Sequence, residues 1–408
     1  MKTQKKKLYQ TIMFLILMTT MFNLWISTSS NAQFKVTAIK TDQIIFDIDE
    51  KFVQYGPLFY YNRVQGPFLG IDASIYLNRL WQIKLMGNLG YGLEDTWRYQ
   101  VGIQKSLWQS NPLAIGFLYY DQVSSLDEWF INHIENSIAA LLIKDDFMDY
   151  FGKNGIIAFI DKKFADVHTI RIEVDQFQFE SLSRQTHWAL FGGNKRFREN
   201  PSVVEEKTTS VRLMWIFDWR DNPLLPISGW YLEGIGEQTF GDSVDTQGLF
   251  VTLKRFQPAF ASHLVKLKLM LGIRKGCDQS YEQYLMDMGG LGTIVAYQDK
   301  EFKNGNRFLF ATARYLFNGA ILRRLPLGFL PFYDQLTLGI FAESGWLYFG
   351  EKNANPFSDF KSIKLSDFKS DIGISLYITE GLARIDLAKR TDRSTDDWRI
   401  TFRLMHKF

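Results

Sequence analysis

Apolar and polar residues alternate along many short segments of this sequence, and this period of two constrains the fold more than any other feature. It is clearest near the end of the chain, in residues 396–407 and just beyond. One set of alternate positions is apolar and comprises Trp398, Ile400, Phe402, Leu404 and, after His406, Phe408. The positions between them carry the cations Arg399, Arg403 and Lys407. Because successive side chains of a β-strand point to opposite faces, this pattern predicts a strand with one apolar and one charged face.

The same alternation recurs along most of the chain and predicts an all-β fold. A tilted strand that crosses a membrane needs about 9–11 residues, which most of these segments provide. We expect sixteen strands, near 67–77, 81–91, 96–106, 112–121, 154–164, 166–180, 185–192, 207–220, 227–241, 245–259, 262–275, 306–318, 333–350, 369–378, 382–390 and 396–407. Single-chain bacterial barrels likewise have an even number of strands. A soluble sandwich or propeller would explain each segment separately, but it explains less easily why nearly every strand carries cations opposite its apolar face.

The composition favours a barrel in a membrane. Aromatic residues make up 16% of the chain, and barrels concentrate aromatic rings at the two membrane interfaces. The mean hydropathy of -0.14 excludes a bundle of membrane helices, whereas the polar lumen of a barrel is compatible with it. The net charge of +3 is too small to indicate a nucleic-acid partner. We therefore expect a transmembrane antiparallel β-barrel with lipid outside and a wet lumen inside.

The N-terminus predicts export. Four lysines in the first seven residues precede an apolar stretch over residues 12–25, which is shorter than the ~20 residues of a membrane-spanning helix. A polar segment then leads to Ala32. We interpret residues 1–32 as a signal peptide cleaved after Ala32, residues 33–66 as an N-terminal arm or plug or an additional strand, and residues 67–408 as the barrel. The expected location is the bacterial outer membrane.

Four longer connections separate the predicted strands. They cover residues 122–153, 193–206, 276–305 and 351–368. Periplasmic turns of such barrels are short, so these segments are expected to be extracellular or to enter the lumen. Apolar residues at helical spacing predict that the first connection is partly helical.

Three segments resemble the bacterial surface antigen family, the barrel domain shared by BamA/TamA-type assembly factors and two-partner secretion transporters. The segments are FDWRDNPLLPISGWYLE at 217–233, MGGLGTIVAYQDKEF at 288–302 and FAESG at 341–345. The resemblance covers roughly residues 207–408. It implies a barrel whose loop 276–305 folds into the lumen, and this chain would be a short member without the family's periplasmic POTRA domains.

The resemblance assigns the tip of that loop to Gly289, Gly290, Val295, Ala296 and Tyr297. Val295 and Ala296 stand where the family has Arg and Gly, and Glu343 stands where it has Asp on the barrel wall. The family's Arg–Asp lock cannot form from residue 295. We hypothesise instead that Glu343 contacts the loop through backbone amides. Arg307 and Lys300 are alternative partners, and the sequence does not choose between them.

Charged residues on the predicted inner faces form a candidate lumen network, with the members Asp218, Arg220, Arg314, Glu343, Arg384 and Asp386. Such a network can fix loops or set an ion preference. The alternative is plain solvation of a polar wall. The C-terminal residues Trp398, Ile400, Phe402, Leu404 and Phe408 resemble the signal that assembly machinery reads on barrels. The alternative is a last strand with an apolar outer face.

Motifs for catalysis and metal binding are missing from the sequence. It contains no nucleophile-elbow, zinc-protease or phosphate-loop pattern, and its five histidines are scattered. Cys277 is the only cysteine, so neither a disulfide nor a cysteine metal cluster can form within the chain. The acidic run at Asp145, Asp146 and Asp149 lies between lysines, which favours a solvated charge run over a Ca²⁺ site. We expect no enzyme, no metal and no cofactor.

The sequence leaves three functions open. The first is a surface-antigen-type barrel for protein translocation, assembly or transport at the outer membrane. The second is a passive pore or structural barrel without a client, and the third and least favoured is a barrel-embedded hydrolase. The expected partners are outer-membrane lipid, the barrel-assembly machinery during biogenesis, and a client or periplasmic protein that the sequence does not identify.

Overall fold

The computed structural model describes residues 53–78, 82–92, 96–107, 113–319, 322, 333–352, 354–378, 383–393, 398–404 and 408. The chain divides into two units, Met1–Gln43 and Ile44–Phe408, and every described element belongs to the second. The predicted signal peptide and residues 33–52 of the predicted arm lie outside the described residues.

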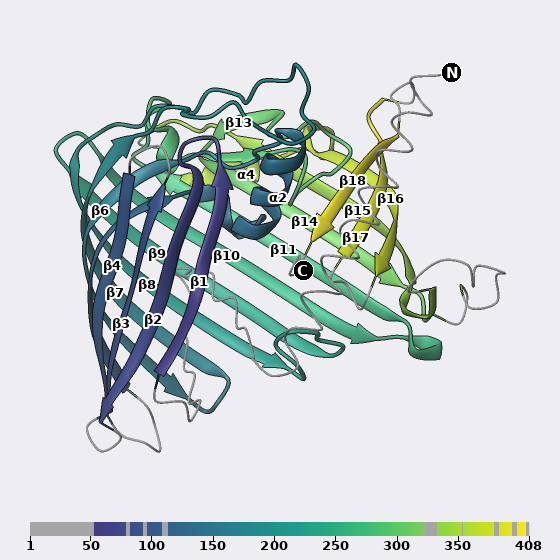
Figure 1. Ribbon diagram of the computed structural model, residues 1–408. Helices are drawn as coiled ribbons and strands as arrows, with labels where there is room; N and C mark the ends of the chain where they lie inside the picture. Colours follow the sequence, from purple (N-terminus) through teal and green to yellow (C-terminus); the bar gives the residue numbers. More distant parts are fainter. Residues whose placement is uncertain are drawn as a thin grey trace. The chain divides into compact units, whose positions relative to one another are not determined.

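Sixteen antiparallel strands form one sheet (Figure 1). Neighbours in the sheet are neighbours along the chain, except that β11 pairs with β14. The strands are β1 (Val53–Asn62), β2 (Gly66–Asn78), β3 (Ile83–Gly92), β4 (Thr96–Leu107), β5 (Leu113–Ser124), β6 (Phe151–Phe164), β7 (His168–Ser181), β8 (Lys207–Arg220), β9 (Gly229–Gly241), β10 (Asp245–Pro258), β11 (Leu264–Lys275), β14 (Arg307–Leu316), β15 (Thr337–Tyr348), β16 (Lys369–Ile378), β17 (Ala383–Arg390) and β18 (Arg399–Leu404).

The shorter elements lie in the connections between strands. A small hairpin is formed by β12 (Met286–Met288) and β13 (Phe302–Gly305), and the α-helices are α2 (His133–Ile143) and α4 (Pro356–Lys361). The 3-10 turns are η1 (Leu126–Trp129), η2 (Phe260–Ser262), η3 (Glu282–Tyr284), η4 (Tyr333–Gln335) and η5 (Leu365–Asp367). Among the described residues, no helix has the length and apolarity that a bilayer span requires.

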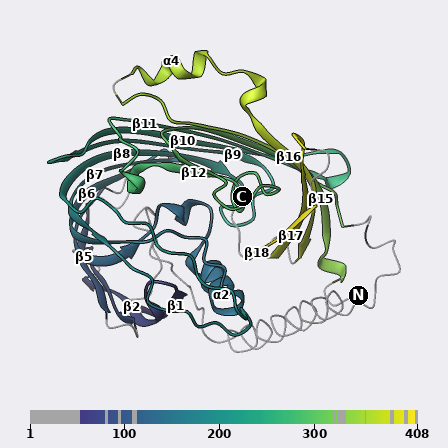
Figure 2. The same cartoon turned by 90° about the horizontal axis from the view of Figure 1, so that it is seen from above.

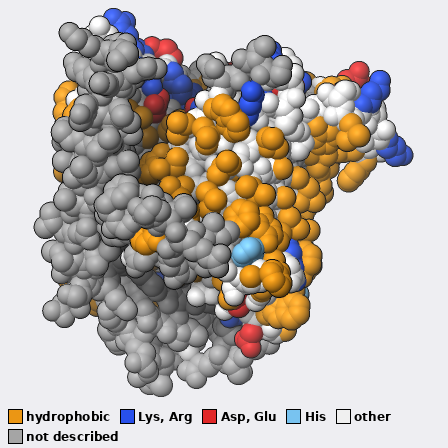
Figure 3. All heavy atoms as spheres, turned by 90° about the vertical axis from the view of Figure 1, so that its right-hand side faces the viewer, with side chains coloured by type: hydrophobic (Ala, Val, Ile, Leu, Met, Phe, Trp, Pro, Cys, Tyr) orange, Lys and Arg blue, Asp and Glu red, His pale blue; other side chains and the backbone are white. Residues whose placement is uncertain are grey.

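The strands bury their charges and expose their apolar residues, which is the reverse of a soluble sheet. In β7, Arg171 and Glu173 are buried, whereas Ile172 and Val174, which alternate with them, are exposed. Figure 3 shows hydrophobic side chains covering the middle of one face of the molecule, with charged ones towards its ends. A strand placed between lipid and a polar interior needs this arrangement. The predicted all-β barrel with two-sided strands is thus confirmed.

Four long connections leave the sheet at the same end, because the strands that precede them all run in the same direction. They are β5–β6 with α2, β7–β8, β11–β14 with the small hairpin, and β15–β16 with α4. Figure 1 shows these elements gathered there, and we call this the loop end. The prediction that the first connection is partly helical is confirmed by η1 and α2.

One detail of the strand prediction was wrong. Residues 185–192 are not a strand, because the Leu190 and Phe191 amides donate to the carbonyls of Leu141 and Leu142 near the end of α2. The sheet begins before residue 67, since β1 lies within residues 33–66 and pairs with β2, which agrees with the alternative of an additional strand there. Pro57 in β1 cannot donate a ladder hydrogen bond, which an edge strand tolerates.

The first and last strands are both edges of the sheet. Among the described residues, β1 pairs only with β2, and β18 pairs only with β17. Seen from the loop end, α2 lies between these two edges (Figure 2). Within the described residues the sheet therefore has a seam, which we define as the edge of β1 that faces away from β2 and the edge of β18 that faces away from β17.

Candidate functional site

A network of charged side chains joins β14 to β17 on the inner face. Arg314 donates to Glu343 over 2.6 Å and to Asp386 over 3.2 Å. Arg384 donates to the other carboxylate oxygen of Asp386 over 2.8 Å. All four side chains are buried, and buried charges are tolerated when they are paired in this way. The structure thus brings four of the six predicted lumen residues together.

The other two predicted residues pair with each other instead. Arg220 binds Asp218 through two hydrogen bonds of 2.7 and 2.6 Å at the end of β8. The Arg220 guanidinium also lies 4.8 Å from the centre of the Tyr231 ring. The pair therefore fixes the turn between β8 and β9 rather than the wall from β14 to β17.

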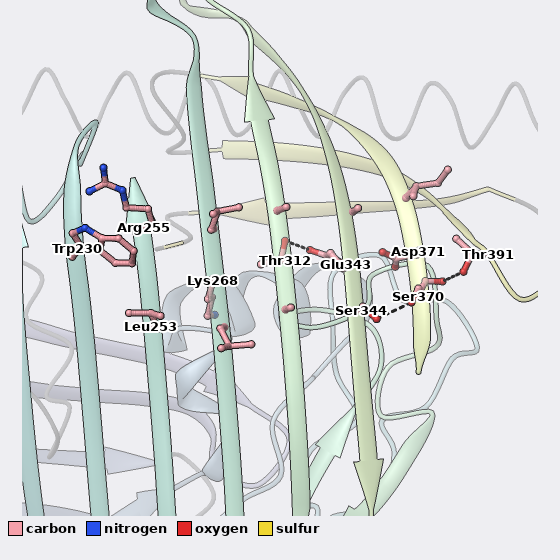
Figure 4. A pocket seen from close by; sticks show the side chains of 16 residues that line it. Trp230, Leu253, Arg255, Lys268, Thr312, Glu343, Ser344, Ser370, Asp371 and Thr391 are labelled. Atoms are coloured by element: carbon pink, nitrogen blue, oxygen red, sulfur yellow. Dashed lines mark hydrogen bonds between the residues drawn. The ribbon is translucent and has the colours of Figure 1, made fainter. Parts of the chain in front are cut away.

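The tip of the loop between β11 and β14 docks on the wall through its backbone. The Val295 amide donates to Glu343 over 3.2 Å, and the Ala296 amide donates to Asp371 over 2.7 Å. Glu343 and Asp371 are directly opposite each other in the β15–β16 register. Figure 4 shows both carboxylates on neighbouring strands, with Glu343 bonded to Thr312. Thr312, Glu343 and Asp371 belong to the lining of a cavity of about 530 Å³.

Tyr297 extends the docking beyond the two amides. Its hydroxyl donates to the Ser370 carbonyl over 3.3 Å, and the Arg390 guanidinium lies 3.9 Å from the centre of its ring. At residues 295–297 the loop tip is thus bound by two backbone amides and the Tyr297 side chain, without the arginine that the resemblance implied at residue 295. Sequence reasoning named Glu343 and the loop but missed Asp371, because its position opposite Glu343 depends on the strand register.

Two glycines shape the tip. Gly289 and Gly290 have φ angles of 119° and 75°, which favour glycine. A Cβ atom on Gly290 would lie 1.9 Å from an oxygen of Asp299, and that oxygen accepts the Leu291 amide. A side chain at this position would therefore break the turn that presents Val295 and Ala296 to the wall.

The two alternative partners for Glu343 bind other carboxylates. Arg307 is buried and donates to Asp359 of α4 over 3.0 Å. The Lys300 ammonium binds Asp127 over 2.7 Å and also binds Asp149. Arg307 therefore ties the wall to the β15–β16 connection, and Lys300 ties the loop tip region to the β5–β6 connection.

The sequence favoured a solvated charge run at 145–149, but the carboxylates of this run form ion pairs with other parts of the fold. Asp146 is buried and lies 3.2 Å from Arg63 of the β1–β2 turn, and Asp149 binds Arg63, Arg198 and Lys300. Although burial raises the pKa of Asp149, these cations outweigh it and lower the pKa to about 2. Among the described residues, no group of His, Cys, Asp and Glu could hold a metal ion.

Phe408 departs from the face that the other residues of the predicted assembly signal share. Ile400, Phe402 and Leu404 alternate with the buried Thr401 and Arg403. Trp398 and Ile400 are exposed on the outer side, and Phe402 and Leu404 are half-buried. The Phe408 ring instead lies 5.8 Å from the ring of Phe256 and 5.9 Å from the Lys266 ammonium. Phe408 also lines a cavity with Arg314, Arg384 and Arg403, so it faces inward. The prediction that it shares the outer face with Ile400 was therefore wrong.

The family model that matches this sequence is described as the Omp85 superfamily domain, and it covers residues 172–408, more than half of the chain. The chain belongs to the Omp85 superfamily. This match confirms the resemblance that the three sequence segments indicated. Together with the fold, it identifies an outer-membrane β-barrel of the Omp85 superfamily.

One solved structure, of BamA, supports the fold. A crystal structure of BamA from Haemophilus ducreyi lacking POTRA domains 1-3 matches with a TM-score of 0.56 and 10% identity, over 86% of this chain and 69% of that one. CdiB from Acinetobacter baumannii matches with a TM-score of 0.42 and 11% identity, over 86% of this chain and 59% of that one. CdiB from Escherichia coli matches with a TM-score of 0.39 and 10% identity, over 87% and 63%. Among curated proteins, none matches the sequence.

Proposed function

We propose that this Omp85 barrel inserts or exports proteins at the outer membrane and that a client strand meets it at the seam. The observation that carries the proposal is that β1 and β18 each pair on one side only among the described residues. An unpaired edge presents a row of backbone donors and acceptors, which is a template for another strand. Closed barrels normally abolish such edges, so a seam in the described sheet supports a role in strand pairing.

The wall beside the seam is held together by buried ion pairs. The network of Arg314, Glu343, Arg384 and Asp386 links β14 to β17. The loop tip is bound to β15 and β16, which lie between these strands. Motion at the seam can therefore occur without loss of the interior wall. A passive pore has no need of an unpaired edge, which disfavours that alternative.

Export and assembly belong to the same proposal. Residues 1–32 would be removed as a signal peptide after Ala32, and the mature chain would enter the outer membrane through the barrel-assembly machinery. Trp398 and Ile400 face outward and are available to that machinery as part of a C-terminal signal. No catalytic role is proposed, and the periplasmic partner is left open.

Site-specific photo-crosslinking tests the proposal. A photo-reactive amino acid is placed at Ile400 of β18, which is 71% exposed, and in a matched control at Ile172 of β7, which is 49% exposed on a strand paired on both sides. Unfolded outer-membrane proteins supplied to the membranes should form adducts at Ile400 only. Equal adducts at both positions, or none at either, would favour a passive or structural barrel.

A further inference from the structure

Helix α2 buries polar side chains that point to separate parts of the fold. Glu135, Asn136 and Ser137 follow one another and are 5%, 1% and 6% exposed. Buried polar groups need partners, and these three find theirs in different elements. Asn136 binds Asp146 and Tyr150 of its own connection, whereas Glu135 and Ser137 reach the two edges of the seam.

The contact with β18 resembles the pairing that a neighbouring strand would give. Glu135 accepts the Leu404 amide over 2.8 Å, and Asn132 at the helix N-cap donates to the Leu404 carbonyl over 3.3 Å. The amide and the carbonyl of Leu404 are therefore both hydrogen-bonded by α2 and its N-cap residue. Glu135 also forms a buried ion pair with Arg403 at 2.8 Å.

The contact with β1 uses a second backbone group. The Tyr61 amide donates to the Ser137 hydroxyl over 2.9 Å, and Ala140 packs against the Tyr61 ring in one buried apolar cluster with Phe197. The two strand edges are not paired with each other among the described residues. Helix α2 therefore occupies both edges at once, near the loop end of the seam.

We propose that α2 is a releasable latch on the seam: while docked it holds the edges of β1 and β18, and the edges become free for strand pairing only when it leaves. This inference rests on the proposed function, because it concerns control of the same seam. A helix of eleven residues is marginal on its own in water, so its position depends on these contacts. A strand that pairs with Tyr61 or Leu404 must displace Ser137 or Glu135.

Cysteine accessibility tests the latch without a client. Ala140→Cys, made together with Cys277→Ser, places a thiol at a site that is 0% exposed while α2 is docked. Glu135→Gln then removes the charged partner of Arg403, and Ser137→Ala removes the acceptor of the Tyr61 amide. Maleimide labelling of the introduced thiol in folded protein should rise roughly tenfold or more with Glu135→Gln and further in the double variant.

A matched control uses the same connection. Asp145→Asn breaks the exposed pair with Lys195 and touches neither edge, so labelling should stay at the parental rate. Each variant must keep heat-modifiable gel migration, which shows that the barrel is folded. Labelling that is equal in Glu135→Gln and Asp145→Asn would overturn the latch. If labelling rises but no variant forms client adducts at Ile400, the latch holds and the proposed function fails.

Discussion

The loop tip and helix α2 both dock inside the barrel, but they do so in opposite ways. The tip offers backbone amides of Val295 and Ala296 to the carboxylates of Glu343 and Asp371. Helix α2 offers the side chains of Glu135 and Ser137 to backbone amides of β18 and β1. In a wall whose strands are paired on both sides, the backbone groups are already hydrogen-bonded, so a docking segment can bind only side chains. At an edge strand, a docking segment can also bind backbone amides and carbonyls.

The largest expected effect concerns the wall. Glu343→Ala leaves Arg314 without one of its two carboxylates and leaves the Val295 amide without an acceptor. Removal of one partner of a buried ion pair costs about 3–5 kcal/mol. We expect a loss of that order in the free energy of unfolding, measured by denaturant titration in detergent. The exposed Glu351 provides the control, and Glu351→Ala should change little.

A backbone substitution separates the two modes of docking. Ala296→Pro removes the amide that Asp371 accepts, and the second carboxylate oxygen of Asp371 already has no hydrogen-bond partner among the described residues. We expect a cost of about 1–3 kcal/mol and a tip that proteases cut more readily. Ala296→Ser keeps the amide and should behave as the parent. If both variants behaved alike, the amide would not hold the tip.

Acid should loosen the connections at the loop end. The pKa of Asp149 is lowered to about 2, below the ordinary value of about 3.9, so its stabilisation is complete above pH 4 and is lost as the pH falls towards 2. The loss is on the order of 2 kcal/mol. Asp149→Asn should be less stable at pH 6 and should show a smaller change in unfolding midpoint between pH 5 and pH 2.5. An unchanged pH profile would contradict the assigned ion pairs.

The smallest effect belongs to the turn between β8 and β9. Asp218→Asn weakens the local pair with Arg220, whose side chains are 28% and 14% exposed. Partly exposed pairs contribute about 0–1 kcal/mol, so unfolding should change by less than this amount. A loss as large as that of Glu343→Ala would connect this pair to the wall network after all.

The sequence predicted the strands well because alternation depends on local residues alone. It left β1 only as an alternative, because Gly56 and Pro57 interrupt the alternation there. It failed at 185–192, where backbone amides donate to carbonyls of α2. Arg314, Glu343, Arg384 and Asp386 could be placed on one face for the same reason. Their partner Asp371 needed the strand register.

The contacts between α2 and the seam could not be predicted from the sequence. Glu135 and Arg403 are 268 residues apart, and the pattern around each one fits an ordinary helix and an ordinary strand. The inward position of Phe408 was likewise missed, because alternation assumed that the last strand continues to the final residue. Contacts that depend on how distant elements are brought together leave no local signal.

Hydrogen exchange of single amides tests the central claim most directly. In the parent, the Leu404 amide should be protected through Glu135, and Glu135→Gln should speed its exchange strongly while the Ile172 amide in β7 stays protected. If β1 and β18 paired directly with each other, the Leu404 amide would remain protected in Glu135→Gln. That result would contradict a seam held by α2.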